Sequence, residues 1–270
     1  MKILLGGDTH GNLHFAWYLV DTAVKNGCDR VFQLGDFGYW EHEKAGVTYL
    51  DKLENRARKS KTTFYFLDGN HDKTSLLVDI YRELDDEGFI VVRDNIRYSP
   101  RGHRWTWNGK RFISLGGAYS TDKAWRLALE KKKAKSITES NTYRPKSRQL
   151  PIDTAGTIWF PEEEMSDEDM DKILADTTPV DVILAHDKPR AANPNCNRKD
   201  ISECWTNQDR LQRAVLTLLP SEFYHGHLHY RYENNILIGD DKYTKVIGLD
   251  SDPESAYSRT KSDAYLVLDW

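Results

Sequence analysis

The sequence predicts an α/β fold, because short apolar runs alternate with amphipathic helical segments along much of the 270-residue chain. Five of the runs have the length of buried strands, and they cover residues 3–5, 31–34, 64–67, 182–184 and 223–224. Polar residues of the types that bind metals follow each run directly. Because the carboxyl ends of parallel strands meet along one edge of an open sheet, we expect these residues to share one site.

The N-terminal part of the chain predicts three helices between the first strands. Asn12 is a favourable N-cap for the first helix, and Asn26 with Gly27 ends it. The second helix is predicted over residues 44–58 and the third over residues 73–84. This order of strand and helix is typical of an α/β unit.

Short strands replace this alternation in the middle of the chain. They are predicted over residues 89–92, 103–107 and 111–115. Asn108-Gly109 is a strong hairpin turn signal between the last two.

The C-terminal part returns to helices and then to strands. Ser166 can cap a helix through Asp169, and another helix is predicted near residues 209–218, after a loop over residues 187–207. The last strands are predicted over residues 230–238, 245–249 and 265–268.

Residues 118–164 are interpreted as an insertion in a single domain that spans residues 1–270. A helix is predicted over residues 121–135, with Trp125 and Leu129 on one face. Basic side chains greatly outnumber acidic ones here. They are Lys123, Arg126, Lys131, Lys132, Lys133, Lys135, Arg144, Lys146 and Arg148.

Two interpretations of this basic segment are open. It is either a flap that recruits a phosphate-bearing substrate or a nucleic acid strand, or a solvated helix face, which we favour. Arg126, beside Trp125, is the best candidate in the segment for a phosphate or base contact.

The bulk composition bears on partners and compartment. The formal net charge of -4 and the pI of about 6.2 give no overall attraction to nucleic acid or to anionic membranes. No apolar run approaches the roughly 20 residues that span a bilayer. Met1 leads directly into a strand, so we expect no signal peptide and a cytoplasmic protein. Cys28, Cys196 and Cys204 lack metal-binding spacing, which favours free thiols.

The polar residues after the five strands form a set of carboxylate, imidazole and amide ligands. The candidate metal ligands are Asp8, His10, Asp36, Asn70, His186, His227 and His229. One ion does not need so many, so we expect two divalent ions, with Mn²⁺ ahead of Fe, Zn, Mg or Ni. Asp36 is the natural bridge, since one carboxylate oxygen for each ion holds a pair about 3.5–4 Å apart.

Such a pair of ions supports hydrolysis of phosphate esters. Two cations lower the pKa of a shared water from about 15.7 toward 7, which makes hydroxide available near neutral pH. The leaving alkoxide then needs a proton, and His71 is the candidate donor. Asp72 is expected to orient His71 through a carboxylate–imidazole hydrogen bond, and Asn70 is expected to lie at the substrate as well as at a metal.

The same residues resemble the ordered signature of the calcineurin-like metallophosphoesterases. They read Asp8-Thr9-His10, Gly35-Asp36, Gly69-Asn70-His71-Asp72, His186 and Gly226-His227-Leu228-His229. Five blocks in the family's order, between residues 8 and 229, are hard to obtain by chance. The resemblance implies a four-layer αββα sandwich of two mixed β-sheets flanked by helices, with a binuclear site between the strand ends.

The resemblance also implies how the ligands divide between the two ions. One ion takes Asp8, His10, Asp36 and His229. The other takes Asp36, Asn70, His186 and His227. His71 stays off the metals as the proton donor.

We therefore expect a binuclear metal-dependent phosphoesterase that uses a metal-activated hydroxide, with small phosphodiesters such as cyclic nucleotides as favoured substrates. A phosphoprotein phosphatase is the closest alternative. A nuclease comes third, because the acidic net charge argues against it while the basic insertion argues for it. A scaffold that acts by binding a partner is the non-enzyme alternative, which the presence of both His71 and Asp36 disfavours.

Overall fold

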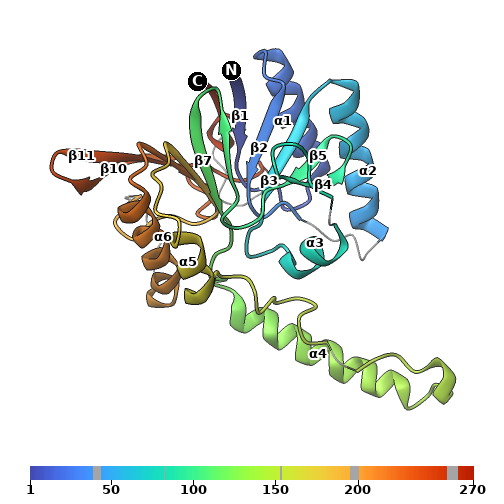
Figure 1. Cartoon of the computed structure of the whole chain (residues 1–270). Coiled ribbons are helices and arrows are strands. Elements are labelled where there is room, and N and C mark those ends of the chain that lie inside the picture. Colours follow the sequence, from blue (N-terminus) through green and yellow to red (C-terminus); the bar gives the residue numbers. More distant parts are fainter. Residues whose placement is uncertain (39–43, 82, 153, 195–200, 254–260) are drawn as a thin grey trace.

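Two six-stranded sheets form the body of the protein (Figure 1). The computed structural model describes residues 1–38, 44–81, 83–152, 154–194, 201–253 and 261–270. The first sheet has the spatial order β12 (Tyr265–Asp269), β1 (Lys2–Gly6), β2 (Arg30–Leu34), β3 (Thr63–Leu67), β5 (Ile96–Tyr98) and β4 (Ile90–Arg93). The second has the order β10 (Tyr232–Gly239), β11 (Lys242–Gly248), β9 (Glu222–His225), β8 (Val182–Ala185), β7 (Lys110–Leu115) and β6 (Arg104–Trp107).

Each sheet is parallel at its centre and antiparallel at its edges. Strands β1, β2, β3 and β5 pair in parallel, as do β7, β8, β9 and β11. The edge strands β12, β4, β10 and β6 pair antiparallel with their neighbours. Both sheets are therefore mixed, and the carboxyl ends of their parallel strands can deliver side chains to one place.

Five of the six described helices pack on the outer faces of the two sheets, and α4 does not. The six are α1 (Leu13–Lys25), α2 (Lys44–Lys59), α3 (Thr74–Ile80), α4 (Lys123–Asn141), α5 (Asp167–Leu174) and α6 (Trp205–Leu218). Along β1, Leu4 packs with the core under α1 and α2, whereas Ile3 and Leu5 pack in the core between the sheets. A third core joins the second sheet to α5 and α6. These three cores confirm the predicted sandwich of two mixed sheets flanked by helices.

The first helix begins as the sequence predicts, and the third is shorter than predicted. The side chain of Asn12 caps α1 by accepting hydrogen bonds from the backbone N–H groups of His14 and Phe15. Helix α3 ends at Ile80 and not near residue 84, because Tyr81 is extended and Leu84 forms a β-bridge with Ile90.

Other elements also differ from the predictions, either in their bounds or because they were not predicted. Strand β5 was not predicted, since three residues are too few to show a pattern. Helix α6 begins at Trp205, four residues before the predicted start, and α4 continues to Asn141 instead of ending near residue 135.

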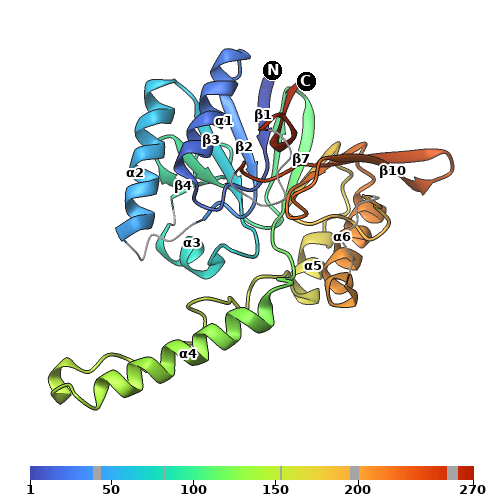
Figure 2. The ribbon, with the colours of Figure 1, turned by 180° about the vertical axis from the view of Figure 1, so that it is seen from behind.

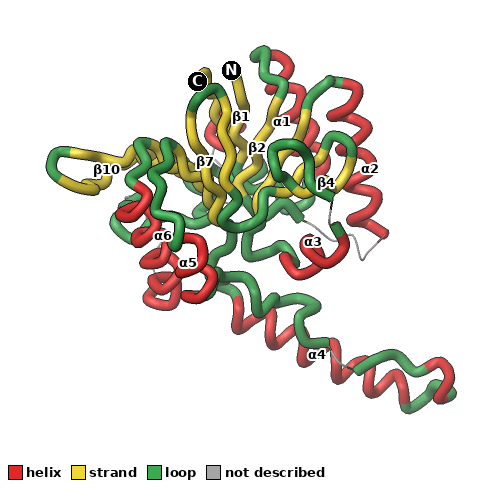
Figure 3. Tube along the Cα trace, viewed as in Figure 1, coloured by secondary structure: helices red, strands yellow, loops and turns green. Residues whose placement is uncertain are grey.

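Helix α4 projects away from the body, and the chain after it returns alongside the helix (Figure 2). The returning segment is loop apart from one 3-10 turn, Lys146–Arg148 (Figure 3). The face of α4 that is buried carries Arg126 and Glu130, whereas Trp125 is 62% exposed. We call residues 131–150, the outer part of α4 and the turn beyond it, the basic arm.

Two of the three cysteines lie in described parts of the chain. Cys28 and Cys204 are buried, and Cys196 lies outside the described residues. Within the described ranges, every helix is too short or too polar to pass through a bilayer.

Candidate metal centre

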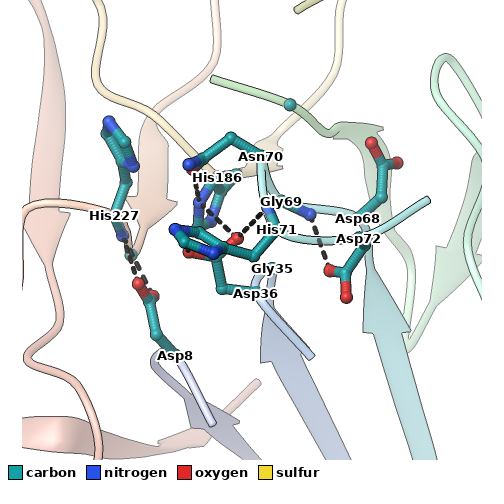
Figure 4. A network of polar contacts seen from close by, with 12 residues as sticks. Asp8, Gly35, Asp36, Asp68, Gly69, Asn70, His71, Asp72, His186 and His227 are labelled. Carbon is teal, nitrogen blue, oxygen red and sulfur yellow. Dashed lines mark hydrogen bonds and ion pairs between the residues drawn. The ribbon is translucent and has the colours of Figure 1, made fainter. Parts of the chain in front are cut away.

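The strand ends bring the predicted ligands together from both sheets (Figure 4). The first sheet contributes Asp8 after β1, Asp36 after β2 and Asn70 after β3. The second sheet contributes His186 after β8, with His227 and His229 after β9. Segments that are far apart in the sequence thus form one polar site at the carboxyl ends of the parallel strands.

The ligand atoms fall into two groups that share Asp36. One group consists of Asp8, His10, Asp36 and His229, and the other of Asp36, His186 and His227. Within each group the ligand atoms lie within 4.8 Å of one another. Two overlapping groups of hard and borderline donors are suited to two divalent ions rather than one.

The carboxylate of Asp36 faces both groups at once. Its Oδ2 lies 3.5 Å from Nε2 of His10, and its Oδ1 lies 3.4 Å from Nε2 of His186. The residue is 2% exposed, so water does not compete strongly for either oxygen. One oxygen toward each group is the arrangement that a bridging carboxylate requires.

Hydrogen bonds behind the site orient the ligands of the second group. Nδ1 of His186 donates to the carbonyl oxygen of Leu34 at 2.7 Å, which leaves Nε2 as the free ligand nitrogen. Nδ2 of Asn70 donates to Oγ of Ser120 at 2.9 Å. The amide oxygen of Asn70 therefore points to the site, 3.1 Å from Nε2 of His186.

An acidic residue that the sequence analysis missed orients His10 in the first group. Oδ1 of Asp252 lies 3.3 Å from Nδ1 of His10, and its Oδ2 accepts a 3.0 Å hydrogen bond from Asn12. Carboxylates behind ligating histidines are common in metal sites and raise the basicity of the ring. Asp252 lies in the loop after β11, and no local pattern marks it; Ser120 was missed for the same reason.

The backbone at the site takes unusual conformations. Positive φ angles occur at His10 (46°), Asp36 (52°), His227 (62°) and His229 (47°). Such angles are uncommon outside glycine and are frequently found at functional sites. Gly35 also has a positive φ of 93°, and a Cβ there would collide with the imidazole of His186. A glycine before Asp36 therefore allows the two sheets to approach closely.

Opposite charges set the protonation of the metal-free centre. Burial lowers the pKa of His10, but hydrogen bonds to Asp252 and Asp36 outweigh it and raise the pKa to about 11. Burial also lowers the pKa of His186, and the charge of Asp36 outweighs it and raises the pKa to about 10. Burial raises the pKa of Asp36, yet the charges of His71 and His186 hold it well below 3.8. The carboxylate of Asp36 is therefore ionised, as a cation site requires.

His71 lies beside the metal ligands, and its partner is an arginine. Its backbone N–H donates to Oδ1 of Asp36 at 2.8 Å, and its Nε2 lies 3.9 Å from Oδ2 of Asp36. Nη2 of Arg126 lies 2.8 Å from Nδ1 of His71. Because a guanidinium can only donate, Nδ1 accepts this hydrogen bond and the neutral ring carries its proton on Nε2.

Asp72 does not orient His71 in the way the sequence analysis expected. Its carboxylate accepts hydrogen bonds from the backbone N–H groups of Phe37, Gly38 and Gly69, at 2.8–2.9 Å. In the described part of the chain, the imidazole of His71 makes no hydrogen bond with Asp72. Asp72 thus ties the loop after β2 to the loop after β3, and the expected carboxylate–imidazole pair is wrong.

Arg126 reaches the site from the root of α4. Its Nη1 donates to the carbonyl oxygen of Asn70 and to Oγ of Ser120, both at 3.3 Å. The side chain is only 6% exposed, and its Nε lies 3.9 Å from Asp122. Of the nine basic residues in the predicted insertion, this one belongs to the site rather than to a solvated surface.

Comparisons with known proteins identify the family of the chain. The model of the calcineurin-like phosphoesterase family matches residues 1–231. Since the match covers most of the chain, the protein belongs to the calcineurin-like phosphoesterase family. It is a metal-dependent phosphoesterase, a hydrolase that acts on phosphate ester bonds. No curated protein matches the sequence.

Solved structures resemble the chain at low sequence identity. A dimetal phosphatase from Danio rerio shares 14% identity, over 99% of this chain and 91% of its own, with a TM-score of 0.52. The protein TT1561 of Thermus thermophilus shares 12% identity, over 93% and 89% of the two chains, with a TM-score of 0.49. The likeness to the phosphatase supports the fold.

Proposed function

We propose that the protein is a binuclear phosphodiesterase in which Asp36 bridges two divalent ions. Asp8, His10, Asp36 and His229 would hold one ion, and Asp36, Asn70, His186 and His227 would hold the other. The opposed oxygens of Asp36 support this assignment most directly, because each is close to an imidazole of a different group. Two such ions, for which we propose Mn²⁺, supply positive charge to the phosphate oxygens and an activated water.

His71 is the proposed proton donor to the leaving oxygen. Its Nε2 is on the side of Asp36, where the phosphate has to lie to reach both groups of ligands. A neutral ring with its proton on Nε2 can give a hydrogen bond to that oxygen. To give the proton away completely, the ring also needs a proton on Nδ1, because only the imidazolium is a good acid near neutral pH.

Arg126 therefore has a role that depends on the substrate. While its Nη2 is hydrogen-bonded to Nδ1 of His71, that nitrogen cannot take a proton. We propose that the substrate phosphate attracts the guanidinium, which is a strong partner for phosphate oxygens, and so releases Nδ1. Binding of the anionic substrate would then prepare His71 as an acid.

Small phosphodiesters, such as cyclic nucleotides, are the proposed substrates. The described residues form two sheets, their covering helices and the projecting α4, with no separate module for docking a folded protein. This supports a compact substrate over a phosphoprotein. A nuclease is the second candidate, and the exposed cations of the basic arm favour it.

A substrate panel tests the proposal. Purified protein with Mn²⁺ is offered an aryl phosphomonoester, an aryl phosphodiester, a cyclic nucleotide and a phosphopeptide. We expect the diesters to be hydrolysed faster than the monoester, with the activity lost in a chelator and restored by Mn²⁺.

Each other outcome favours a different function. Fast turnover of the phosphopeptide alone would make the protein a phosphoprotein phosphatase. Failure on every ester would favour the scaffold that acts by binding a partner. Equal activity with and without chelator would contradict the two-ion proposal.

A further inference from the structure

The basic arm is an ordered projection whose charges do not serve the fold. Oε1 of Glu130 accepts hydrogen bonds from the backbone N–H groups of Thr157, Ile158 and Trp159, which ties the returning chain to the root of α4. At the far end, Asn141 exchanges two hydrogen bonds with the backbone of Leu150. The arm is therefore braced at both ends, although most of its side chains are exposed.

The exposed charges of the arm are almost all positive. The exposed cations are Lys131, Lys132, Lys133, Lys135, Arg144, Lys146 and Arg148. Glu139 is the single acidic residue between residues 131 and 150, and it lies 3.9 Å from Lys135. A chain with a net charge of -4 thus concentrates positive charge on one projecting element.

A solvated helix face does not explain this arrangement. Such a face belongs to a helix whose opposite face lies in a core, and beyond Glu130 the buried residue of α4 is Asn141. The lysines at 131, 132 and 133 point in different directions around the helix, since successive residues are about 100° apart. The positive charge therefore lies on several sides of the arm, while the face with Ala134, Ile137 and Asn141 is partly covered.

We propose that the basic arm is a docking surface for single-stranded nucleic acid. Cations on several sides of a projecting helix suit a flexible chain of phosphates, which can bend to follow them. Tyr143, at the end of the arm, is 90% exposed and stands next to Arg144, with Lys146 and Arg148 nearby. An exposed aromatic ring among cations is a platform on which an unpaired base can stack.

The composition of the arm disfavours two other partners. A membrane surface would need an apolar face along the helix, and the buried positions of α4 are Arg126, Glu130 and Asn141. An acidic protein would satisfy the cations but would have no specific use for the exposed ring of Tyr143.

The root of the arm connects this surface to the metal centre. Arg126, on the first turns of α4, contacts His71 directly. The helix has 19 residues, so its outer end lies about 28 Å from its start. A strand bound along the arm would have phosphodiester bonds near the two proposed ions. That last step rests on the proposed function, whereas binding of the strand to the arm does not.

Fluorescence anisotropy of a labelled single-stranded phosphorothioate oligonucleotide tests the proposal on the metal-loaded protein. We expect binding that weakens with salt. In the triple variant Lys131→Ala/Lys132→Ala/Lys133→Ala, the slope of log K against log salt should be smaller by about 2, since each lost phosphate contact changes it by about 0.7. Tyr143→Ala should weaken binding about tenfold, through lost stacking.

A matched triple variant controls for total charge. Lys25→Ala/Lys52→Ala/Lys59→Ala removes three exposed lysines from α1 and α2 and should leave binding within twofold of the wild type. An equal loss in both triple variants would contradict a defined docking surface. Equal affinity for a duplex, with no effect of Tyr143→Ala, would overturn the single-strand proposal. Polyglutamate that competes as strongly as the unlabelled oligonucleotide would also overturn it.

Turnover of an aryl phosphodiester separates this proposal from the proposed function. The arm variants should hydrolyse it at the wild-type rate, because none of the changed residues touches the metal centre. A protein that binds the oligonucleotide but hydrolyses no ester would refute the proposed function and leave the docking surface standing. A protein that hydrolyses esters and does not bind the oligonucleotide would refute the docking surface and leave the proposed function standing.

Discussion

The metal centre and the basic arm are joined by the first turns of α4, which carry Arg126, yet the two regions hold their charges in opposite ways. In the centre, Asp8, Asp36 and His186 are buried, and contacts behind the candidate ligands fix several of them, as the carbonyl of Leu34 fixes His186. In the arm, long side chains are exposed, and Lys135 lies 3.9 Å from Glu139. Buried, preorganised charge gives directional chemistry, whereas exposed charge gives an attraction that tolerates many geometries.

This contrast predicts how the two regions should respond to substitution. Removal of one group from the centre leaves its buried partners uncompensated, so single changes there should have large and specific effects. Removal of one cation from the arm leaves the others in water, so effects there should be small and nearly additive. The predictions below test the contrast from the largest expected effect to the smallest.

Asp36→Asn should have the largest effect, because this residue belongs to both ligand groups. We expect at least about a thousandfold loss of phosphodiester turnover, more than the 10–100-fold typical of partners behind the ligands. Metal content should fall with it, measured by elemental analysis after desalting. A variant that retains two ions and its activity would show that Asp36 is not the bridge.

His71→Ala should retain metal and lose about 10²–10⁴ in turnover, the usual contribution of a proton donor. The loss should be greater for alkyl esters than for aryl esters, because poor leaving groups need the proton most.

Arg126→Met should chiefly raise KM, if its guanidinium moves to the phosphate. Steady-state kinetics on an aryl and an alkyl diester separate the two roles. An equal loss on both esters in His71→Ala would contradict proton donation.

Asp252→Ala should weaken metal binding about 10–100-fold, because it removes the carboxylate behind His10. A titration with Mn²⁺ followed by calorimetry measures this. Asp240→Asn, on an exposed turn, is the control and should bind as the wild type does. Unchanged affinity in Asp252→Ala would mean that the hydrogen bond to His10 is incidental.

Metal binding should release protons, because ligand imidazoles must be unprotonated. With pKa values raised to about 11 and about 10, His10 and His186 hold protons at pH 8 in the metal-free protein. The pKa of His227 is lowered, mainly by burial, to about 3, so it has no proton to lose. Affinity should therefore fall as the pH decreases, with about two protons released for the pair of ions. Calorimetry in two buffers of different ionisation enthalpy measures this, and heats independent of buffer would contradict it.

We expect the smallest effect on the turnover of a small substrate by a variant with substitutions in the basic arm. Replacement of Lys131, Lys132 and Lys133 by alanine should change the turnover of a small diester by less than about twofold, since exposed charges beyond a Debye length of about 10 Å are screened. A large change would show that the arm and the centre are not separable.

The sequence predicts most of the metal centre because each ligand directly follows a buried strand. Asp8, Asp36 and His186 are recognisable from the apolar runs before them, and the topology then brings them together. The contacts behind the ligands are not predictable in this way. Asp252 and Ser120 lie in loops, and they orient the site only because the fold places the side chains of His10 and Asn70 beside them.

Helix α4 also makes a contact that the sequence does not predict. The sequence predicts a basic helix, and Arg126 stands out in it only as a neighbour of Trp125. In the structure, a buried Arg126 contacts His71 while Trp125 is exposed. Burial of a charged residue depends on a partner from another element, which no local pattern encodes.

Electron paramagnetic resonance of the protein loaded with Mn²⁺ tests the central claim most directly. If Asp36 bridges the ions, two Mn²⁺ should bind per chain and give the spectrum of an exchange-coupled pair, which Asp36→Asn should abolish. One Mn²⁺ per chain, or two with the spectrum of isolated ions, would contradict the account.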